Sequence, residues 1–239
     1  MAIFTRGDVN IYYEEYGSGF PVLLIAPGGM RSEMTFWART PWNPIEQLSS
    51  KYRVIAMDQR NAGHSTAPIR ATDNWPVYTE DQLALMDHLG IDRFHVAGMC
   101  IGGSYIMALS KAAPQRVASG VVFQTIGLDG NRQAFYDMFD SWADELRPQR
   151  PDVDPGAWAP FRDAMYGTDF LFTCTREEAA ACPTPLLVLL GNDLYHPEAS
   201  SRDLAALAPH ATLIENWKEP EHHAAAIAEM DRFLALHSG

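Results

Sequence analysis

The chain has 239 residues, which is long enough for one large α/β domain, and its 47% hydrophobic and 20% charged residues are an ordinary globular balance. Its formal net charge of −12 argues against nucleic acid and against anionic membrane surfaces as partners, because both are recognised by basic patches.

The N-terminal residues lack the basic stretch and long apolar run of a secretory signal. Nowhere in the chain do about 18 apolar residues follow one another, as a membrane span requires. We therefore expect a cytoplasmic protein without membrane contact, in which Cys100, Cys174 and Cys182 are reduced thiols. Neither Cys-x-x-Cys nor His-Glu-x-x-His spacing occurs, so no metal site is predicted.

The first predicted element is a β-hairpin, with strands over residues 2–5 and 9–16 and a turn between them. Short apolar runs follow, each bounded by turn residues: 22–26, 52–57, 94–98, 120–123, 186–190 and 211–214. Runs that are apolar on both faces are typical of strands buried inside a mostly parallel sheet.

Helical patterns separate these runs. One covers residues 79–89, with Thr79 as a candidate N-cap, and two more cover 200–207 and 220–236. The alternation of strand and helix predicts an α/β fold with a doubly wound, mostly parallel sheet of eight strands.

The segment 126–184 breaks this alternation, because it contains helical pieces rich in aromatic residues and no good strand. A segment of this length is too long for a plain connection in a compact domain. We interpret it as a small helical cap over the edge of the sheet where ligands bind, with residues 1–125 and 185–239 forming the core. The alternative is that its aromatic side chains merely pack the insert's own core.

The turn Gly98-Met99-Cys100-Ile101-Gly102-Gly103 leads from an apolar run into a helical stretch. Glycines two residues before and after Cys100 allow a sharp turn from strand to helix, which holds the central side chain at the top of the sheet. The turn therefore predicts a covalent nucleophile, and the nucleophile here is a thiol. The alternative is a small buried residue in an inactive turn.

A nucleophile needs a base and a group that orients the base. Asp193 follows the run 186–190 and is the candidate acid, while His222 and His223 follow the last run and are the candidates for the base. Counting along the last strand favours His222, whereas helical phase turns His223 toward the sheet. His196, close to Asp193 in the chain, is a third candidate.

These patterns resemble those of the α/β-hydrolase fold, and the resemblance covers nearly the whole chain. Four sequence motifs support the resemblance: Ala26-Pro27-Gly28-Gly29-Met30, Asp58-Gln59-Arg60-Asn61-Ala62-Gly63-His64-Ser65, the turn around Cys100, and the loop from Asp193 to Pro197. The cysteine turn is similar to that of dienelactone hydrolases. Three departures from the family pattern are Pro27-Gly28 for His-Gly, Glu221-His222 for Gly-His, and Cys100 for Ser.

The resemblance implies an oxyanion hole made by the backbone N–H groups of Ile101 and of Gly29 or Met30. We interpret Asp58 and Arg60 as a structural ion pair that fixes their loop, and not as catalytic groups.

A thiol at a helix N-terminus beside an imidazolium favours the thiolate, which attacks carbonyl carbons and leaves readily. We therefore expect a hydrolase that cleaves a small or medium apolar ester, lactone or thioester through an acyl-cysteine. A lyase or carbon–carbon bond hydrolase on the same site, and a non-catalytic ligand-binding protein, are the alternatives. No glycine-rich phosphate loop occurs, so the expected partner is a small-molecule substrate without a cofactor; a homo-oligomer is left open.

Overall fold

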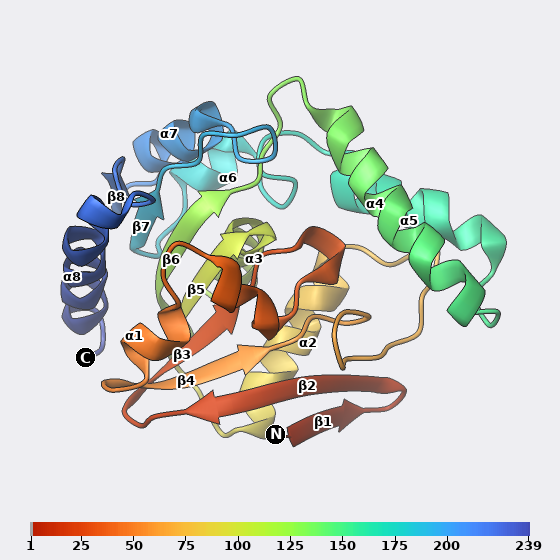
Figure 1. Ribbon diagram of the computed structural model, residues 1–239, viewed down its shortest axis with the longest axis horizontal. Coiled ribbons are helices and arrows are strands. Elements are labelled where there is room, and N and C mark those ends of the chain that lie inside the picture. The colour runs from red at the N-terminus through yellow and green to blue at the C-terminus, as the bar shows by residue number, and fades with distance from the viewer. Residues whose placement is uncertain (1) are drawn as a thin grey trace.

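The computed structural model describes residues 2–239, which fold around one eight-stranded sheet (Figure 1). The strands are β1 (Ala2–Arg6), β2 (Val9–Tyr16), β3 (Phe20–Ile25), β4 (Tyr52–Met57), β5 (Phe94–Cys100), β6 (Val117–Thr125), β7 (Leu186–Leu189) and β8 (Ala211–Ile214). Their order across the sheet is β1-β2-β4-β3-β5-β6-β7-β8. Strand β2 runs antiparallel to both neighbours, and β3 to β8 are parallel.

Helices cover both faces of the sheet (Figure 1). The α-helices are α1 (Pro44–Leu48), α2 (Trp75–His88), α3 (Ile101–Ala112), α4 (Arg132–Leu146), α5 (Trp158–Tyr166), α6 (Arg176–Ala180), α7 (Glu198–Leu207) and α8 (Pro220–Leu236). Short 3-10 helices are η1 (Gly29–Arg31), η2 (Met34–Arg39), η3 (Arg147–Gln149) and η4 (Pro155–Ala157). Side chains of α2, α3 and α7 enter one hydrophobic core, and those of α1, η2 and α8 enter a second core on the opposite face.

The predicted fold class is confirmed, as each apolar run singled out in the sequence contributes to one of the eight strands. Boundaries differ most at α2, which begins at Trp75 rather than near Thr79. Pro76 lies in its first turn, where a missing N–H costs nothing. Thr79 instead donates its hydroxyl to the Trp75 carbonyl, 3.2 Å away, from inside the helix.

The segment 126–184 is helical and contains no strand, and it holds α4, α5 and α6. Helix α4 packs against η1, which follows β3, and against α5, so this pair lies at the carboxyl end of the parallel strands (Figure 1). The short α6 packs instead against α7 of the core. The aromatic residues of α4 and α5 contact one another, and some also line the site described below.

The expected ion pair between Asp58 and Arg60 is wrong. The Asp58 carboxylate accepts hydrogen bonds from the backbone N–H groups of Met34 and His64, at 2.8 and 2.9 Å. Arg60 is buried and pairs with Asp81 on α2, with 2.6 Å between Nε and Oδ2. Asp58 and Arg60 therefore bind different parts of the chain, and no ion pair joins them.

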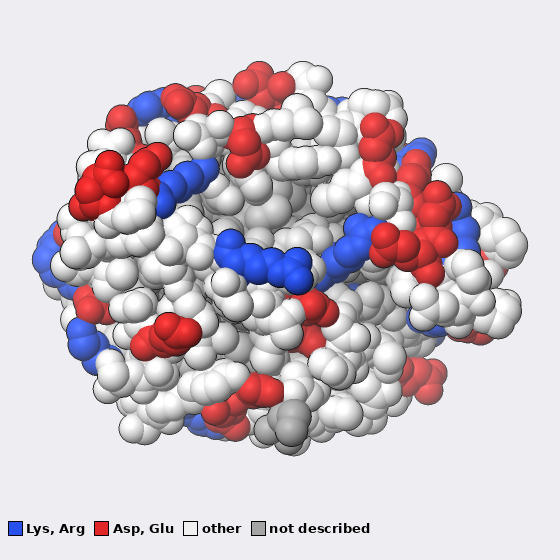
Figure 2. Space-filling model, in the orientation of Figure 1, with Lys and Arg blue, Asp and Glu red and all other residues white. Residues whose placement is uncertain are grey.

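Charged side chains of both signs are scattered over the face drawn in Figure 2, which shows no broad basic area. No helix within residues 2–239 is long and apolar enough to cross a bilayer.

Candidate active site

Cys100 ends β5 and is the N-cap of α3, with φ 61° and ψ −114°. This backbone conformation is unfavourable for any residue other than glycine. It projects the thiol away from both β5 and α3. Gly98 and Gly103 are required here because neighbouring atoms approach their Cα atoms too closely for a side chain. A Cβ on Gly98 would lie 2.8 Å from the Gly102 backbone, and one on Gly103 would lie 2.5 Å from the Thr125 Cβ. Strand and helix can meet at this angle only because those side chains are absent.

The loop after β7 brings an acid and an imidazole together within four residues. Both carboxylate oxygens of Asp193 lie within hydrogen-bond distance of His196 Nδ1, at 2.7 and 2.8 Å. Oδ1 also accepts hydrogen bonds from the backbone N–H groups of Tyr195 and His196, at 3.0 and 3.1 Å. The turn folds back so tightly that a Cβ on Gly191 would lie 2.7 Å from the His196 Cβ. The imidazole is thus held by its own loop.

His196 and Cys100 line the same pocket, and their charges favour each other. Burial raises the pKa of Cys100, but the charge of His196, its hydrogen bond and the backbone N–H groups of Gly28 and Ile101 together outweigh that effect, so the pKa lies below its ordinary value. Burial lowers the pKa of His196, while the Cys100 charge and the hydrogen bond to Asp193 raise it to about 9. The hydrogen bond from His196 lowers the pKa of Asp193 to about 2. Each of the three side chains thus stabilises the charged form of its neighbour, which favours a thiolate–imidazolium pair more than isolated side chains would.

His196 Nε2 is the ring atom that Asp193 leaves free. It is buried, and Cys100 interacts with the ring through both its charge and a hydrogen bond, which raise the pKa of His196. Because Nδ1 is bonded to the carboxylate, Nε2 is available to exchange a proton with a group in the pocket.

The structure brings neither His222 nor His223 into this pocket. Only five residues, 215–219, join β8 to α8, and Trp217 fastens this connection by donating its indole N–H to the Leu190 carbonyl at 2.9 Å. Both histidines consequently fall on the first turn of α8, where His223 Nε2 bonds to the Lys218 carbonyl at 2.8 Å. Of the three histidines considered in the sequence, His196 is the one beside Asp193 and Cys100.

Two backbone N–H groups face the Cys100 sulfur. Hydrogen bonds from Gly28 and Ile101 contribute to lowering its pKa. The resemblance implied Ile101 together with Gly29 or Met30; Gly29 lines the pocket next to Gly28, whereas Met30 is not among its lining residues. Both glycines have positive φ, 121° and 59°, and a Cβ on Gly29 would lie 2.4 Å from Met138 Sδ. The glycines thus let α4, which carries Met138, approach this loop closely.

The pocket has a volume of about 220 Å³ and is mostly apolar. Its lining residues are Gly28, Gly29, Cys100, Ile126, Phe135, Met138, Tyr166, Tyr195 and His196. Lys and Arg are absent from this set, so the pocket offers no side-chain cation other than the imidazolium.

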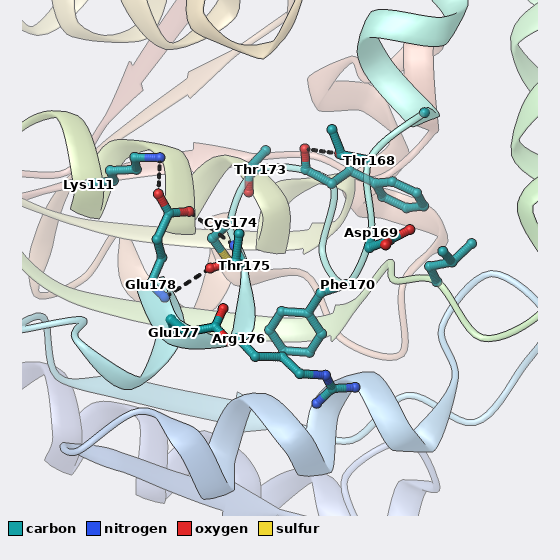
Figure 3. A pocket seen from close by; sticks show the side chains of 13 residues that line it. Lys111, Thr168, Asp169, Phe170, Thr173, Cys174, Thr175, Arg176, Glu177 and Glu178 are labelled. Carbon is teal, nitrogen blue, oxygen red and sulfur yellow. Dashed lines mark hydrogen bonds and ion pairs between the residues drawn. The ribbon is translucent and has the colours of Figure 1, made fainter.

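A larger cavity of about 790 Å³ lies elsewhere, beside the loop 167–178 (Figure 3). Its thiol is Cys174, whose pKa burial raises to about 12, so it is not a nucleophile at neutral pH. Lys111, at the left of the view, is paired with Glu178. This cavity therefore lacks the activated groups that Cys100 and His196 provide.

The position of His196 had a signal in the sequence. Gly191-Asn192-Asp193-Leu194-Tyr195-His196-Pro197 joins a glycine, an aspartate that accepts backbone N–H bonds within its own turn, and a helix-starting proline. Such a turn brings residues three apart into contact. The histidines after the last strand were favoured because strand count and helical phase pointed to them, whereas the structure places the imidazole beside Asp193 in the loop after β7.

Comparisons with known proteins agree with this fold. The protein-family model described as α/β hydrolase fold matches residues 21–154 of the sequence. The chain is 37% identical over 113 residues to a putative carbamate hydrolase RutD of Azorhizobium caulinodans, covering 47% of this chain and 40% of that protein. It is 28% identical over 269 residues to a 2-hydroxymuconate semialdehyde hydrolase of Pseudomonas putida, covering 94% and 92% of the two chains.

Among solved structures, the enol-lactonase from Burkholderia xenovorans superposes with a TM-score of 0.72 at 24% identity, covering 98% of this chain and 100% of that one. At this identity the similarity shows a shared fold. Together with the match over more than half of the sequence, it establishes that the chain belongs to the α/β-hydrolase fold family.

Proposed function

We propose that the protein is a cysteine hydrolase that cleaves a compact, apolar ester, lactone or thioester through an acyl-cysteine intermediate. The observation that carries this proposal is the placement of His196, oriented by Asp193, in one pocket with a thiol whose pKa is lowered. The names of two similar proteins, the enol-lactonase and the carboxylesterase YbfK of Bacillus subtilis (25% identical over 224 residues, 82% of this chain and 73% of that one), agree with this reaction class.

Acylation begins when the Cys100 thiolate attacks the carbonyl carbon and forms a carbon–sulfur bond. The carbonyl oxygen becomes an oxyanion, which the N–H groups of Ile101 and of Gly28 or Gly29 stabilise; one such donor is typically worth about 3–4 kcal/mol. The oxyanion then collapses and expels the alkoxide or thiolate leaving group, which takes the proton from His196 Nε2.

Deacylation reverses these roles. Neutral His196 takes a proton from water, and the hydroxide attacks the acyl carbon. Collapse of the second tetrahedral intermediate releases the carboxylic acid and returns the sulfur as a thiolate beside the imidazolium. Asp193 keeps the proton on Nδ1 throughout, so that Nε2 alone exchanges protons with the substrate.

Intact-mass measurement with 4-nitrophenyl acetate tests the proposal. We expect an initial burst of one nitrophenolate per chain before steady turnover and, in samples quenched during turnover, a gain of one acetyl group located on Cys100 by peptide mapping. Cys100→Ala should abolish both signals. Cys174→Ala, which removes a buried thiol with a raised pKa, is the matched control and should acylate normally. Absence of acetyl on Cys100 in the active wild type contradicts the proposal.

Carbon–carbon bond hydrolysis is a second candidate. The specific observation in its favour is the similarity over nearly the whole chain to the 2-hydroxymuconate semialdehyde hydrolase. In this case His196 and the oxyanion donors act on a ketone without an acyl-cysteine. Turnover of benzoylacetone that survives in Cys100→Ala, with no adduct in the wild type, would favour this second candidate over the first.

A further inference from the structure

Tyr166, the last residue of α5, has a hydroxyl group that the fold leaves without a partner. The side chain is fully buried, and its oxygen makes no hydrogen bond within residues 2–239. Leaving a buried donor unpaired is unfavourable, and such groups in folded proteins call for an explanation. Tyr166 lines the pocket that contains Cys100 and His196, which suggests that its partner comes from a ligand.

The ring of Tyr166 is held rigidly by other aromatic residues. Phe135 stacks on it with ring centroids 5.3 Å apart, and Phe172 and Trp75 pack edge-on at 5.4 and 6.0 Å. The Trp75 indole N–H also donates to the Met165 carbonyl at 2.6 Å, which fixes the end of α5. The hydroxyl therefore cannot swing away to find a partner elsewhere in the protein.

The residues that line the pocket differ in their exposure to solvent. Met138 and Tyr195 are partly exposed, whereas Phe135 and Tyr166 are fully buried. Burial raises the pKa of Tyr166 far above its ordinary value, and the charge of Cys100 adds to this effect. The hydroxyl thus stays protonated and remains a neutral hydrogen-bond donor among the lining residues.

We propose that Tyr166 is a substrate-binding residue whose hydroxyl donates a hydrogen bond to an oxygen of a compact, uncharged carbonyl compound. This inference rests on the proposed function in placing the reacting carbonyl at Cys100. A substrate oxygen that reaches Tyr166 meets a donor that is already desolvated and fixed, so little reorganisation accompanies binding. A carboxylate there would be buried without a Lys or Arg counter-ion, which disfavours anionic substrates.

Tyr166→Phe removes the hydroxyl alone and keeps the aromatic packing, so it separates binding from folding. Because the lost hydroxyl has no partner in the free protein, we expect an unchanged or raised melting temperature. We expect kcat/KM for acylation by 4-nitrophenyl acetate to fall about 10-fold, as the loss of one hydrogen bond between uncharged groups implies. The pH midpoint of Cys100 alkylation should stay at the wild-type value.

Tyr78→Phe is the matched control. Tyr78 is also fully buried with an unpaired hydroxyl, but it packs against Tyr105 and Arg60 and does not line the pocket. This variant should gain stability as Tyr166→Phe does, while its kcat/KM stays within about twofold of wild type. Equal activity losses in both variants would show a general effect of the buried aromatic cluster and overturn the inference.

A second measurement does not depend on acyl transfer. The dissociation constant of benzamide, an unreactive neutral carbonyl compound, should rise at least about fivefold in Tyr166→Phe and stay unchanged in Tyr78→Phe. If wild type fails to acylate but benzamide binding still requires Tyr166, the proposed function fails and this inference stands. If wild type acylates and Tyr166→Phe matches it in both assays, or if wild type does not bind benzamide, this inference fails.

Discussion

Asp193 places both carboxylate oxygens within 2.8 Å of His196 Nδ1, three residues further along the same loop. Acid and base in this site are thus supplied by one turn after β7, and the connection between β8 and α8 contributes no imidazole to the pocket. Because one loop holds both groups, a substitution at Asp193 acts on the imidazole through their direct hydrogen bonds.

Replacing His196 tests which imidazole activates the thiol. Burial raises the pKa of Cys100 and the charge of His196 lowers it, so His196→Ala should move the midpoint of Cys100 alkylation upward, to or above that of an ordinary thiol. Acyl transfer should fall at least about 100-fold. The measurement is the pH dependence of iodoacetamide labelling, read by mass on the Cys100 peptide.

His222→Ala and His223→Ala are the controls for that experiment, because both side chains lie on α8 outside the pocket. Each should keep the wild-type midpoint. A shift in either variant comparable to that in His196→Ala would contradict the assignment of the base.

Asp193→Asn tests the orienting role of the carboxylate. The hydrogen bond to Asp193 contributes to raising the pKa of His196 to about 9, so its loss should lower that pKa and weaken the imidazolium beside Cys100. We expect kcat for ester hydrolysis to fall about 10²- to 10⁴-fold, with a smaller change in KM, since the amide does not support the required tautomer equally. NMR titration of the His196 ring measures the pKa directly, and an unchanged value would argue against this role.

Most strands and helices of the fold could be predicted from the amino-acid pattern, whereas the contacts made by loop residues could be predicted less well. Runs such as 186–190 are apolar on both faces, which only a strand between two helical layers requires, so the sheet could be predicted. The turn at Cys100 was recognisable because backbone crowding at Gly98, Gly102 and Gly103 leaves a sequence signature.

Contacts between distant segments left no such signature. Arg60 has Asp58 two residues away, yet pairs with Asp81, because α2 passes directly over it. Likewise, the length of chain between β8 and α8 decides whether a histidine can reach Cys100, and that length depends on where α8 begins. Pocket residues such as Tyr166 are fixed by how α4 and α5 pack, which no local pattern encodes.

Gly98→Ala tests the crowding at the turn. A Cβ at this position would lie 2.8 Å from the Gly102 backbone, which cannot move without displacing α3. We expect a loss of about 1–3 kcal/mol in the free energy of unfolding, together with reduced acylation of Cys100. Gly156→Ala, where a Cβ would have ordinary contact with Asp154 at 3.4 Å, should change the unfolding free energy by less than about 0.5 kcal/mol. Urea denaturation of both variants checks the contrast.

Asp81→Asn tests the buried pair that the sequence did not predict. Asp81 is 1% exposed and accepts hydrogen bonds from Arg60 and Arg6, each at 2.6 Å. Neutralising it leaves the buried Arg60 guanidinium uncompensated, which should lower the free energy of unfolding by about 3–5 kcal/mol. Asp87→Asn breaks a pair with Arg116 in which the carboxylate side chain is 65% exposed, and should cost less than about 1 kcal/mol. Similar losses in the two variants would contradict this account of Arg60.

His95 gives the protein a specific sensitivity to acid. Its ring is fully buried between the hydroxyls of Ser119 and Ser238, at 2.8 and 3.0 Å. Burial lowers its pKa to about 3, with smaller contributions from the charges of His237 and Arg93. The folded protein therefore keeps His95 neutral at pH values where the unfolded chain, with an ordinary histidine pKa near 6.5, binds a proton.

The sign of the effect follows from this difference. Between about pH 6.5 and pH 3 the unfolded state binds more protons, so stability falls as the pH falls, by up to about 1.4 kcal/mol per pH unit from this residue. His95→Gln removes the titrating group, so its unfolding free energy should decline less steeply between pH 6 and pH 4, by about 2 kcal/mol in total. His210→Gln, at an exposed position, should keep the wild-type slope. Parallel slopes for wild type and His95→Gln in urea denaturation would show that His95 does not set the acid limit of this fold.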